Sequence, residues 1–226
     1  MDIKRITLGI TNSYLLEGDE GYVMIDAGTI KQEKKFLHRV THLGIQAAQI
    51  KLIIITHAHF DHVGSLAAIK ALCNNCPVLI HPLEAELLST PVVAIPPGTN
   101  LQGKIISSLG RFNRPLLKFP PVTAEQIFDG QFDLNIYGID GKVIHTPGHT
   151  TGSLSVLLGD GKAIVGDLAV NYKVSDIFPP FAVDPENLFA SWNLLIKAGA
   201  KRIYPAHGSS FPVEKLLKSY DEHMKA

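Results

Sequence analysis

The sequence predicts an α/β protein whose single domain contains two similar halves, each with a sheet and helices. Two observations predict this. Short apolar runs typical of strands alternate with helical patterns through most of the 226 residues. The segment Asn12–Asp26 also aligns without a gap on Ser153–Asp167, and each segment has the pattern strand, Gly-Asp turn, strand, aspartate. We therefore expect one domain over 1–226, with halves of roughly 1–125 and 126–226.

Each element of the first half follows from its residue pattern. Two apolar runs around the Gly18–Gly21 turn predict a hairpin, and an apolar stripe through Phe36 and Val40 predicts a helix. In order, we expect strands or helices at Tyr14–Leu16 (strand), Tyr22–Ile25 (strand), Lys31–Gln46 (helix), Ile50–Ile55 (strand), Ser65–Leu72 (helix), Val78–Ile80 (strand) and Glu84–Ser89 (helix).

The second half is expected to begin near Gln126 and to repeat the progression from strands to helices. Its expected elements are strands at Phe132–Tyr137, Gly141–Ile144, Leu154–Leu158 and Ala163–Val165, a helix at Pro185–Ala198, a strand at Lys201–Tyr204 and a closing helix at Pro212–Met224. Between the halves, residues 91–121 are rich in proline, and their only charged residues are basic. This segment is interpreted as a helical lid or insert with a basic edge; a solvated amphipathic helix is the alternative.

Composition excludes several classes of protein. Lys and Arg together equal Asp and Glu, so the formal net charge is zero, which argues against nucleic acid or an anionic membrane as a partner. The N-terminus does not resemble a signal peptide, and no apolar run is long enough to span a membrane. We expect a soluble, cytoplasmic protein that acts on a small molecule, with a homodimer left open. Cys73 and Cys76 form a C-x-x-C pair, interpreted as two ordinary thiols in a loop.

Histidines follow the predicted strands of both halves. His57, His149 and His207 each come just after an apolar strand pattern, and Asp167 follows another. Loops that leave one edge of a sheet converge, and α/β proteins place their ligands at that edge. We therefore expect these four side chains to share one site.

The spacing within Thr56–Gly64, T-H-A-H-F-D-H-V-G, favours metal binding. In an extended chain the side chains of residues i and i+2 point the same way, so His57 and His59 can bind one ion. A turn then directs Asp61 and His62 to a neighbouring point. Imidazole and carboxylate groups suit zinc, and also iron or manganese. A metal ion takes the place of the protons that would otherwise make clustered histidines repel each other.

The motifs resemble those of the metallo-β-lactamase superfamily. T-H-A-H-F-D-H matches its H-x-H-x-D-H signature, and T-P-G-H-T (Thr146–Thr150), G-D (Gly166–Asp167) and Y-P-A-H-G (Tyr204–Gly208) look like its later motifs in the right order. I-D-A-G (Ile25–Gly28) resembles its early strand-end motif. The resemblance implies a four-layer αβ/βα sandwich, in which two mixed sheets carry helices on their outer faces.

The resemblance also implies two metal sites, which hold two divalent ions, with zinc preferred over iron or manganese. His57, His59 and His149 would hold the first metal, and Asp61, His62 and His207 the second, with Asp167 bridging them. Asp61 would be a ligand, a proton carrier or both, and Asp26 would orient ligands. The remaining histidines are interpreted as non-ligands: His38, His42, His81, His145 and His223.

The predicted function is a dinuclear metal-dependent hydrolase in which a metal-bridging hydroxide attacks a small ester, thioester or lactone. The sequence contains no G-x-S-x-G elbow or Walker A loop, the motifs that would indicate a serine hydrolase or a nucleotide-binding protein instead. The alternatives are an iron-dependent sulfur dioxygenase, or β-lactamase or phosphodiesterase activity at the same site. Tyr172 is the candidate substrate-binding residue, and Phe178 and Phe181 are candidates for a pocket wall.

Overall fold

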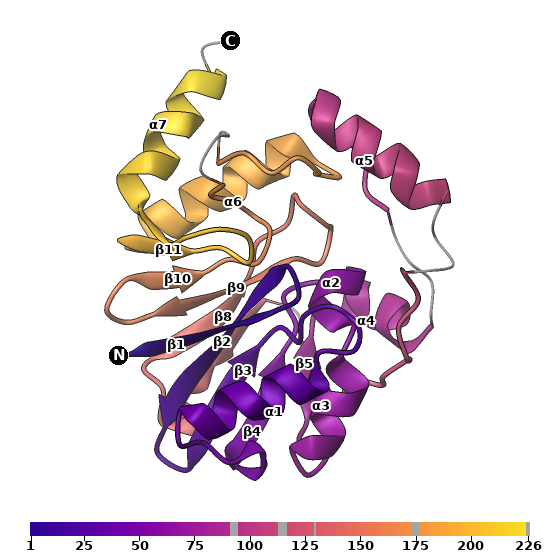
Figure 1. Ribbon diagram of the computed structural model, residues 1–226. Helices are drawn as coiled ribbons and strands as arrows, with labels where there is room; N and C mark the ends of the chain where they lie inside the picture. Colours follow the sequence, from indigo (N-terminus) through magenta and orange to yellow (C-terminus); the bar gives the residue numbers. More distant parts are fainter. Residues whose placement is uncertain (91–94, 113–116, 129, 173–176, 225–226) are drawn as a thin grey trace.

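The computed structural model describes residues 1–90, 95–112, 117–128, 130–172 and 177–224. These residues form two six-stranded sheets that pack against each other, and helices cover the outer surface of each sheet (Figure 1). The predicted four-layer αβ/βα sandwich is therefore confirmed.

The first sheet comes from the N-terminal part of the chain, and its strands lie in sequence order. The first three strands pair antiparallel and the rest pair parallel, so the sheet is mixed. Its strands are β1 (Ile3–Leu8), β2 (Thr11–Gly18), β3 (Gly21–Ile25), β4 (Ile50–Ile54), β5 (Val78–Ile80) and β6 (Gln126–Ile127).

The second sheet also follows the sequence order, and only β10 and β11 pair in parallel. A parallel pair needs a crossover connection, which the long helix α6 provides here. The strands are β7 (Gln131–Asp133), β8 (Gly141–His145), β9 (Leu154–Leu158), β10 (Lys162–Ile164), β11 (Arg202–Tyr204) and β12 (Phe211–Pro212).

Helices α1 and α3 cover the first sheet, and α6 and α7 cover the second (Figure 1). The short helices α2 and α4 follow β4 and β5, and α5 lies near the loop that contains Pro180. The α-helices are α1 (Glu33–His42), α2 (Phe60–Val63), α3 (Leu66–Leu72), α4 (Pro82–Ser89), α5 (Leu101–Phe112), α6 (Pro185–Lys197) and α7 (Val213–Met224). None of the helices in the described parts of the chain is long and apolar enough to cross a membrane.

Strand alternation builds a core on both faces of the sheets. In β4, Leu52 and Ile54 pack between the sheets, whereas Ile53 packs under the helices of the first sheet. In the second sheet, Val156 joins the central core and Leu157 packs toward Trp192 of α6. A strand covered on both faces reads as a continuous apolar run, as Leu52–Ile54 of β4 does.

Two predicted elements were wrong in extent. The predicted strand Phe132–Tyr137 ends at Asp133, and Leu134–Tyr137 is a 3-10 helix. The Asp133 side chain accepts a hydrogen bond from Asn135 N at 2.9 Å, and such a local cap competes with strand pairing. The predicted helix Lys31–Gln46 is shorter, because Gly44 has φ +73° and ends α1 with a Schellman-type turn. The strand β1 was not predicted, although all six of its residues pair with β2.

Candidate metal centre

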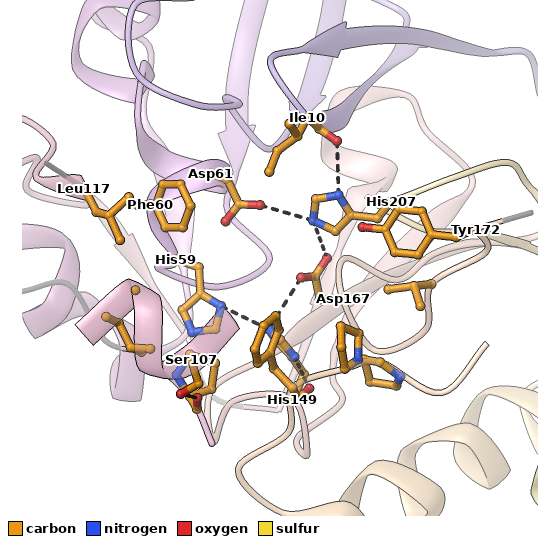
Figure 2. Close-up of a pocket in the computed structure, with 17 residues that line it drawn as sticks. Ile10, His59, Phe60, Asp61, Ser107, Leu117, His149, Asp167, Tyr172 and His207 are labelled. Atoms are coloured by element: carbon orange, nitrogen blue, oxygen red, sulfur yellow. Dashed lines mark hydrogen bonds and ion pairs between the residues drawn. The ribbon is translucent and has the colours of Figure 1, made fainter. Parts of the chain in front are cut away.

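The seven predicted ligand side chains lie together at one edge of the two sheets. Figure 2 shows five of them: His59, Asp61, His149, Asp167 and His207. His57 and His59 follow β4, and Asp61 and His62 lie in α2. The other three come from the second half: His149 from the β8–β9 loop, Asp167 from the end of β10 and His207 from the end of β11. All seven residues are at most 8% exposed.

His57, His59 and His149 form the three-histidine group. His149 Nε2 lies 3.2 Å from His57 Nε2 and 3.0 Å from His59 Nδ1. Metal–nitrogen bonds of ~2.0–2.1 Å in a tetrahedron place two nitrogens about 3.3 Å apart. The three nitrogens therefore have nearly the spacing of one face of a coordination tetrahedron.

Asp61, His62 and His207 form the mixed group. His207 Nε2 lies 3.1 Å from Asp61 Oδ2, and His62 Nε2 lies 3.9 Å from the same oxygen. The ligand atoms of this group all lie within 4.8 Å of one another. Nitrogen and oxygen donors of this kind suit zinc, iron or manganese.

Asp167 lies between the two groups and offers one oxygen to each. Its Oδ1 lies 3.4 Å from the Nε2 atoms of both His62 and His207, and its Oδ2 lies 3.6 Å from His149 Nε2. Among the described residues, Asp167 Oδ1 and His62 Nε2 are buried without a hydrogen-bond partner. Buried polar atoms usually have a partner, so these two atoms fit a site made to bind metal.

Four of the five candidate ligand histidines are each oriented by a hydrogen-bond contact of the other ring nitrogen. His149 Nδ1 donates to Phe181 O at 2.9 Å, and His207 Nδ1 donates to Ile10 O at 3.1 Å. His62 Nδ1 contacts Asp26 Oδ2 at 2.8 Å. With Nδ1 engaged in this way, each ring presents its Nε2 to the site.

Thr56 connects the fourth histidine to Asp26. The Thr56 hydroxyl donates to Asp26 and lies 3.1 Å from His57 Nδ1, so its oxygen can accept from that nitrogen. Asp26 also accepts from Thr56 N at 2.9 Å. This carboxylate thus orients His62 directly and His57 through Thr56, which matches the orienting role expected for Asp26.

The three-histidine group is neutral. Burial lowers the pKa of His59 to about 3 and holds the pKa of His57 well below its usual value. Burial also lowers the pKa of His149, although the Asp167 carboxylate opposes this shift. Neutral imidazoles have the free lone pairs that metal binding requires.

The mixed group is charged when no metal is bound. Burial lowers the pKa of His62, but the carboxylates of Asp26, Asp167 and Asp61 outweigh it and raise the pKa to about 10. Burial opposes ionisation of Asp61, yet His62 and His207 bring its pKa to about 2. The pKa of His207 is likewise raised well above its usual value, because Asp167 and Asp61 outweigh the effect of burial. Metal ions would replace these protons and keep the carboxylates compensated.

The sequence did not identify Glu84 of α4 as part of the site. Its carboxylate is 1% exposed and accepts from Ala58 N at 2.9 Å and from Gly152 N at 3.2 Å. Ala58 stands between His57 and His59, and Gly152 lies in the loop that carries His149. Glu84 therefore ties together the two loops of the three-histidine group. A single glutamate in a helical pattern gives no sequence signal for such a role.

The start of β2 was also missed as part of the site. Asn12 Nδ2 donates to Gly208 O at 2.8 Å and to Pro205 O at 3.3 Å, so it holds the loop that carries His207. Thr11 Oγ1 donates to Asp61 Oδ2 at 3.2 Å. The available signal was a set of polar residues, Thr11–Ser13, that opens a buried strand.

The five histidines interpreted as non-ligands lie outside the metal-type groups found among the described residues. The rings of His81 and His145 stack with centroids 4.1 Å apart, and His145 Nε2 donates to Thr151 O at 2.8 Å. His38 and His42 are exposed on α1, and His223 is exposed on α7.

Cys73 and Cys76 are free thiols, buried at the end of α3 and in the turn after it. This position fits the interpretation of two ordinary thiols.

A pocket of about 430 Å³ opens over the ligand side chains (Figure 2). Helix α5 contributes Ser107 and Gly110 to its wall, and the segment beside it contributes Ile95 and Pro96. Thr99 N donates to Pro180 O at 2.9 Å, which attaches this region to the opposite wall. The predicted lid or insert 91–121 thus borders the site in its described part. Residues 91–94 and 113–116 lie outside the described residues.

The predicted substrate-contact residues separate into two sets. Tyr172 lines the pocket and is 46% exposed, and its ring lies 6.1 Å from the His207 ring at 25°. Phe181 lines the pocket as well. Phe178 instead packs with Trp192 and Phe189 in the core beneath α6.

The fold and the cluster of ligand-type side chains define an αβ/βα sandwich protein with a candidate two-metal centre at one sheet edge. The chain belongs to the metallo-beta-lactamase superfamily, whose family model matches residues 6–207. A probable metallo-hydrolase from Methanocaldococcus jannaschii, MJ0888, is 32% identical over 204 residues, which cover 88% of this chain and 87% of the relative.

Solved structures show the same fold. TTHA1623, whose crystal structure was determined in a di-iron-bound form, is 27% identical, with a TM-score of 0.69 and coverage of 96% of this chain and 98% of that one. The B3 metallo-beta-lactamase BLEG-1 is 22% identical, with a TM-score of 0.68 over 96% and 97% of the two chains. At that identity the second likeness shows the shared fold alone.

Proposed function

We propose that this protein is a dinuclear metal-dependent hydrolase that acts on a small ester, thioester or lactone. The observation that carries the proposal is the arrangement of seven buried ligand side chains in two groups, with Asp167 between them, at the base of a pocket. The probable metallo-hydrolase relative, which matches across most of both chains, supports the same class.

The donor set fits two divalent metal ions. His57, His59 and His149 would hold the first ion and Asp61, His62 and His207 the second, while Asp167 would contact both. Zinc suits these nitrogen and oxygen ligands, and the di-iron form of TTHA1623 supports iron as a second choice. Such a pair would supply Lewis acidity and would lower the pKa of water enough to provide a nucleophile near neutral pH.

The protein's own residues would position the reaction. Asp61 lies in the mixed group and its Oδ2 accepts a hydrogen bond from Thr11 Oγ1, so this carboxylate would be the proton carrier of the reaction. Tyr172 stands at the pocket wall beside His207, where its hydroxyl can donate to a substrate oxygen.

A sulfur dioxygenase is the second candidate, and the di-iron relative is the observation that favours it. The two candidates differ in their need for oxygen. Iron-loaded protein that consumes oxygen with a persulfide substrate, and is inert in its absence, would favour the dioxygenase. Anaerobic turnover of an ester or lactone by zinc-loaded protein would favour the hydrolase.

The test combines metal analysis of the purified protein with a substrate panel of esters, thioesters, lactones and phosphodiesters. We expect two metal ions per chain, hydrolysis of at least one carbonyl substrate, and loss of the activity on treatment with a chelator. Fully metal-loaded protein that is inert toward every carbonyl substrate would contradict the proposal.

A further inference from the structure

The walls of the pocket above the metal-type groups are largely apolar. Apart from the ligand side chains, the described residues that line it are Ile10, Phe60, Ile95, Pro96, Ser107, Gly110, Leu117, Val170, Tyr172, Pro179, Pro180 and Phe181. Tyr172 and Ser107 supply the polar side-chain atoms in this set. The Ser107 hydroxyl already donates to Pro96 O at 2.8 Å, so its proton is committed within the protein.

In its described part, this wall suits an apolar group better than an anionic one. The described lining residues beyond the ligand set include neither lysine nor arginine. A carboxylate or phosphate in this part of the pocket would lose water without gaining a cationic partner, and an unpaired buried charge is costly. A hydrocarbon group would instead gain free energy from each methylene removed from water.

Ile10 gives the pocket an apolar rim that the fold itself does not require. Its side chain is 65% exposed in the β1–β2 turn, so it contributes little to the core. The backbone carbonyl of the same residue accepts from His207 Nδ1 and fixes the turn beside the site (Figure 2). Ligand pockets are lined mainly by apolar side chains, so an exposed isoleucine that lines a pocket at its mouth is placed to contact a ligand.

We propose that the natural substrate is uncharged around its scissile carbonyl and carries an apolar chain that packs between Ile10, Phe60 and Phe181. This inference rests on the proposed hydrolase function and narrows its substrate class. The chain would displace water from the apolar walls, while the carbonyl would lie near Tyr172 and the ligand groups. Each buried methylene should raise kcat/KM by about fourfold until the pocket is filled.

The test is a series of p-nitrophenyl esters from acetate to octanoate, assayed with the metal-loaded protein. An ester of equal chain length that ends in a free carboxylate is the charged comparison. We expect kcat/KM to rise along the neutral series, and the charged ester to react at least about tenfold more slowly than its neutral counterpart. A flat series, or a charged ester that reacts as fast as the neutral one, would overturn the inference. No turnover of any ester, thioester or lactone would instead contradict the hydrolase function.

A matched pair of variants tests whether Ile10 determines the preference for neutral over charged esters. Ile10→Lys places a cation at the pocket rim, and Ile136→Lys makes the same change at a 71% exposed isoleucine of the 3-10 helix Leu134–Tyr137, which does not line the pocket. We expect Ile10→Lys to lower the ratio of neutral to charged ester turnover severalfold, and Ile136→Lys to leave it unchanged. Circular dichroism and metal content verify that both variants fold. An unchanged ratio in folded, metal-loaded Ile10→Lys would overturn the assignment of Ile10 to the substrate wall.

Discussion

The two halves of the molecule contribute their candidate metal ligands in different ways. The first half supplies four candidate ligands within six residues, His57 to His62, after the single strand β4. The second half supplies three, and each comes from a different strand end. The first set is arranged by local chain geometry, whereas the second depends on how β8, β10 and β11 align in one sheet. Contacts that link the halves should therefore affect metal binding, although less than the candidate ligands themselves.

The largest effect is expected at the residue common to both groups. Asp167→Ala removes the oxygens that lie near His62, His207 and His149. We expect metal content to fall below two per chain and hydrolysis to fall by more than about a hundredfold, beyond the range typical of residues that only orient ligands. Metal analysis and steady-state kinetics measure both. Asp221→Ala, at an exposed aspartate of α7, is the control and should change neither. Two bound metals and a normal rate in Asp167→Ala would remove this residue from the site.

A smaller effect is expected where the first half orients its own ligands. Asp26→Asn replaces the carboxylate that contacts His62 Nδ1 with an amide. The amide NH2 group is a donor, so it cannot accept a hydrogen bond from Nδ1 as the carboxylate oxygen does. We expect affinity for the metal held by the mixed group to fall about 10–100-fold. The three-histidine group should lose less, because Asp26 reaches His57 only through Thr56. Stepwise metal titration separates the two affinities, and equal losses at both would argue for general destabilisation.

A substitution of Glu84 tests the hydrogen bonds that link the two halves. Glu84→Gln leaves one acceptor oxygen for two backbone N–H donors, Ala58 N and Gly152 N. We expect affinity for the metal held by the three-histidine group to fall about tenfold, because the two loops lose a common anchor. Glu86→Gln, at an exposed glutamate of the same helix, is the matched control. If both variants bind metal like the original protein, Glu84 does not position the loops.

The smallest effect is expected at a histidine near the site that holds no ligand position. His145→Ala removes a hydrogen bond to Thr151 O and a stacking contact with His81. The loss should be about 1 kcal/mol of stability, or about 2–4 °C in Tm for a domain of this size. Metal content should remain unchanged. A fall in metal content would place His145 among the residues that support the site.

Much of the fold was predictable because its strands are buried on both faces. Continuous apolar runs such as Val78–Ile80 identify a buried strand without tertiary information. The two errors in element length arose from local interactions that the periodic pattern does not show. The Asp133 cap ended β7, and Gly44 ended α1. The strand β1 was missed because its sequence, I-K-R-I-T-L, mixes charged and apolar residues, and its stability comes from pairing with β2.

The sequence by itself determined the chemistry of the candidate site, because metal-ligand residue types at fixed spacings after strands are a local property of the chain. It thereby indicated all seven ligand-type residues before their positions in space were known. Only the tertiary structure decided which other groups hydrogen-bond to these seven residues. The acceptors for His149 and His207 are the backbone oxygens of Phe181 and Ile10, and a carbonyl oxygen carries no sequence signature. The apolar walls are likewise decided by folding, since Ile10, Phe60 and Phe181 are distant in sequence and line one pocket only in the folded chain.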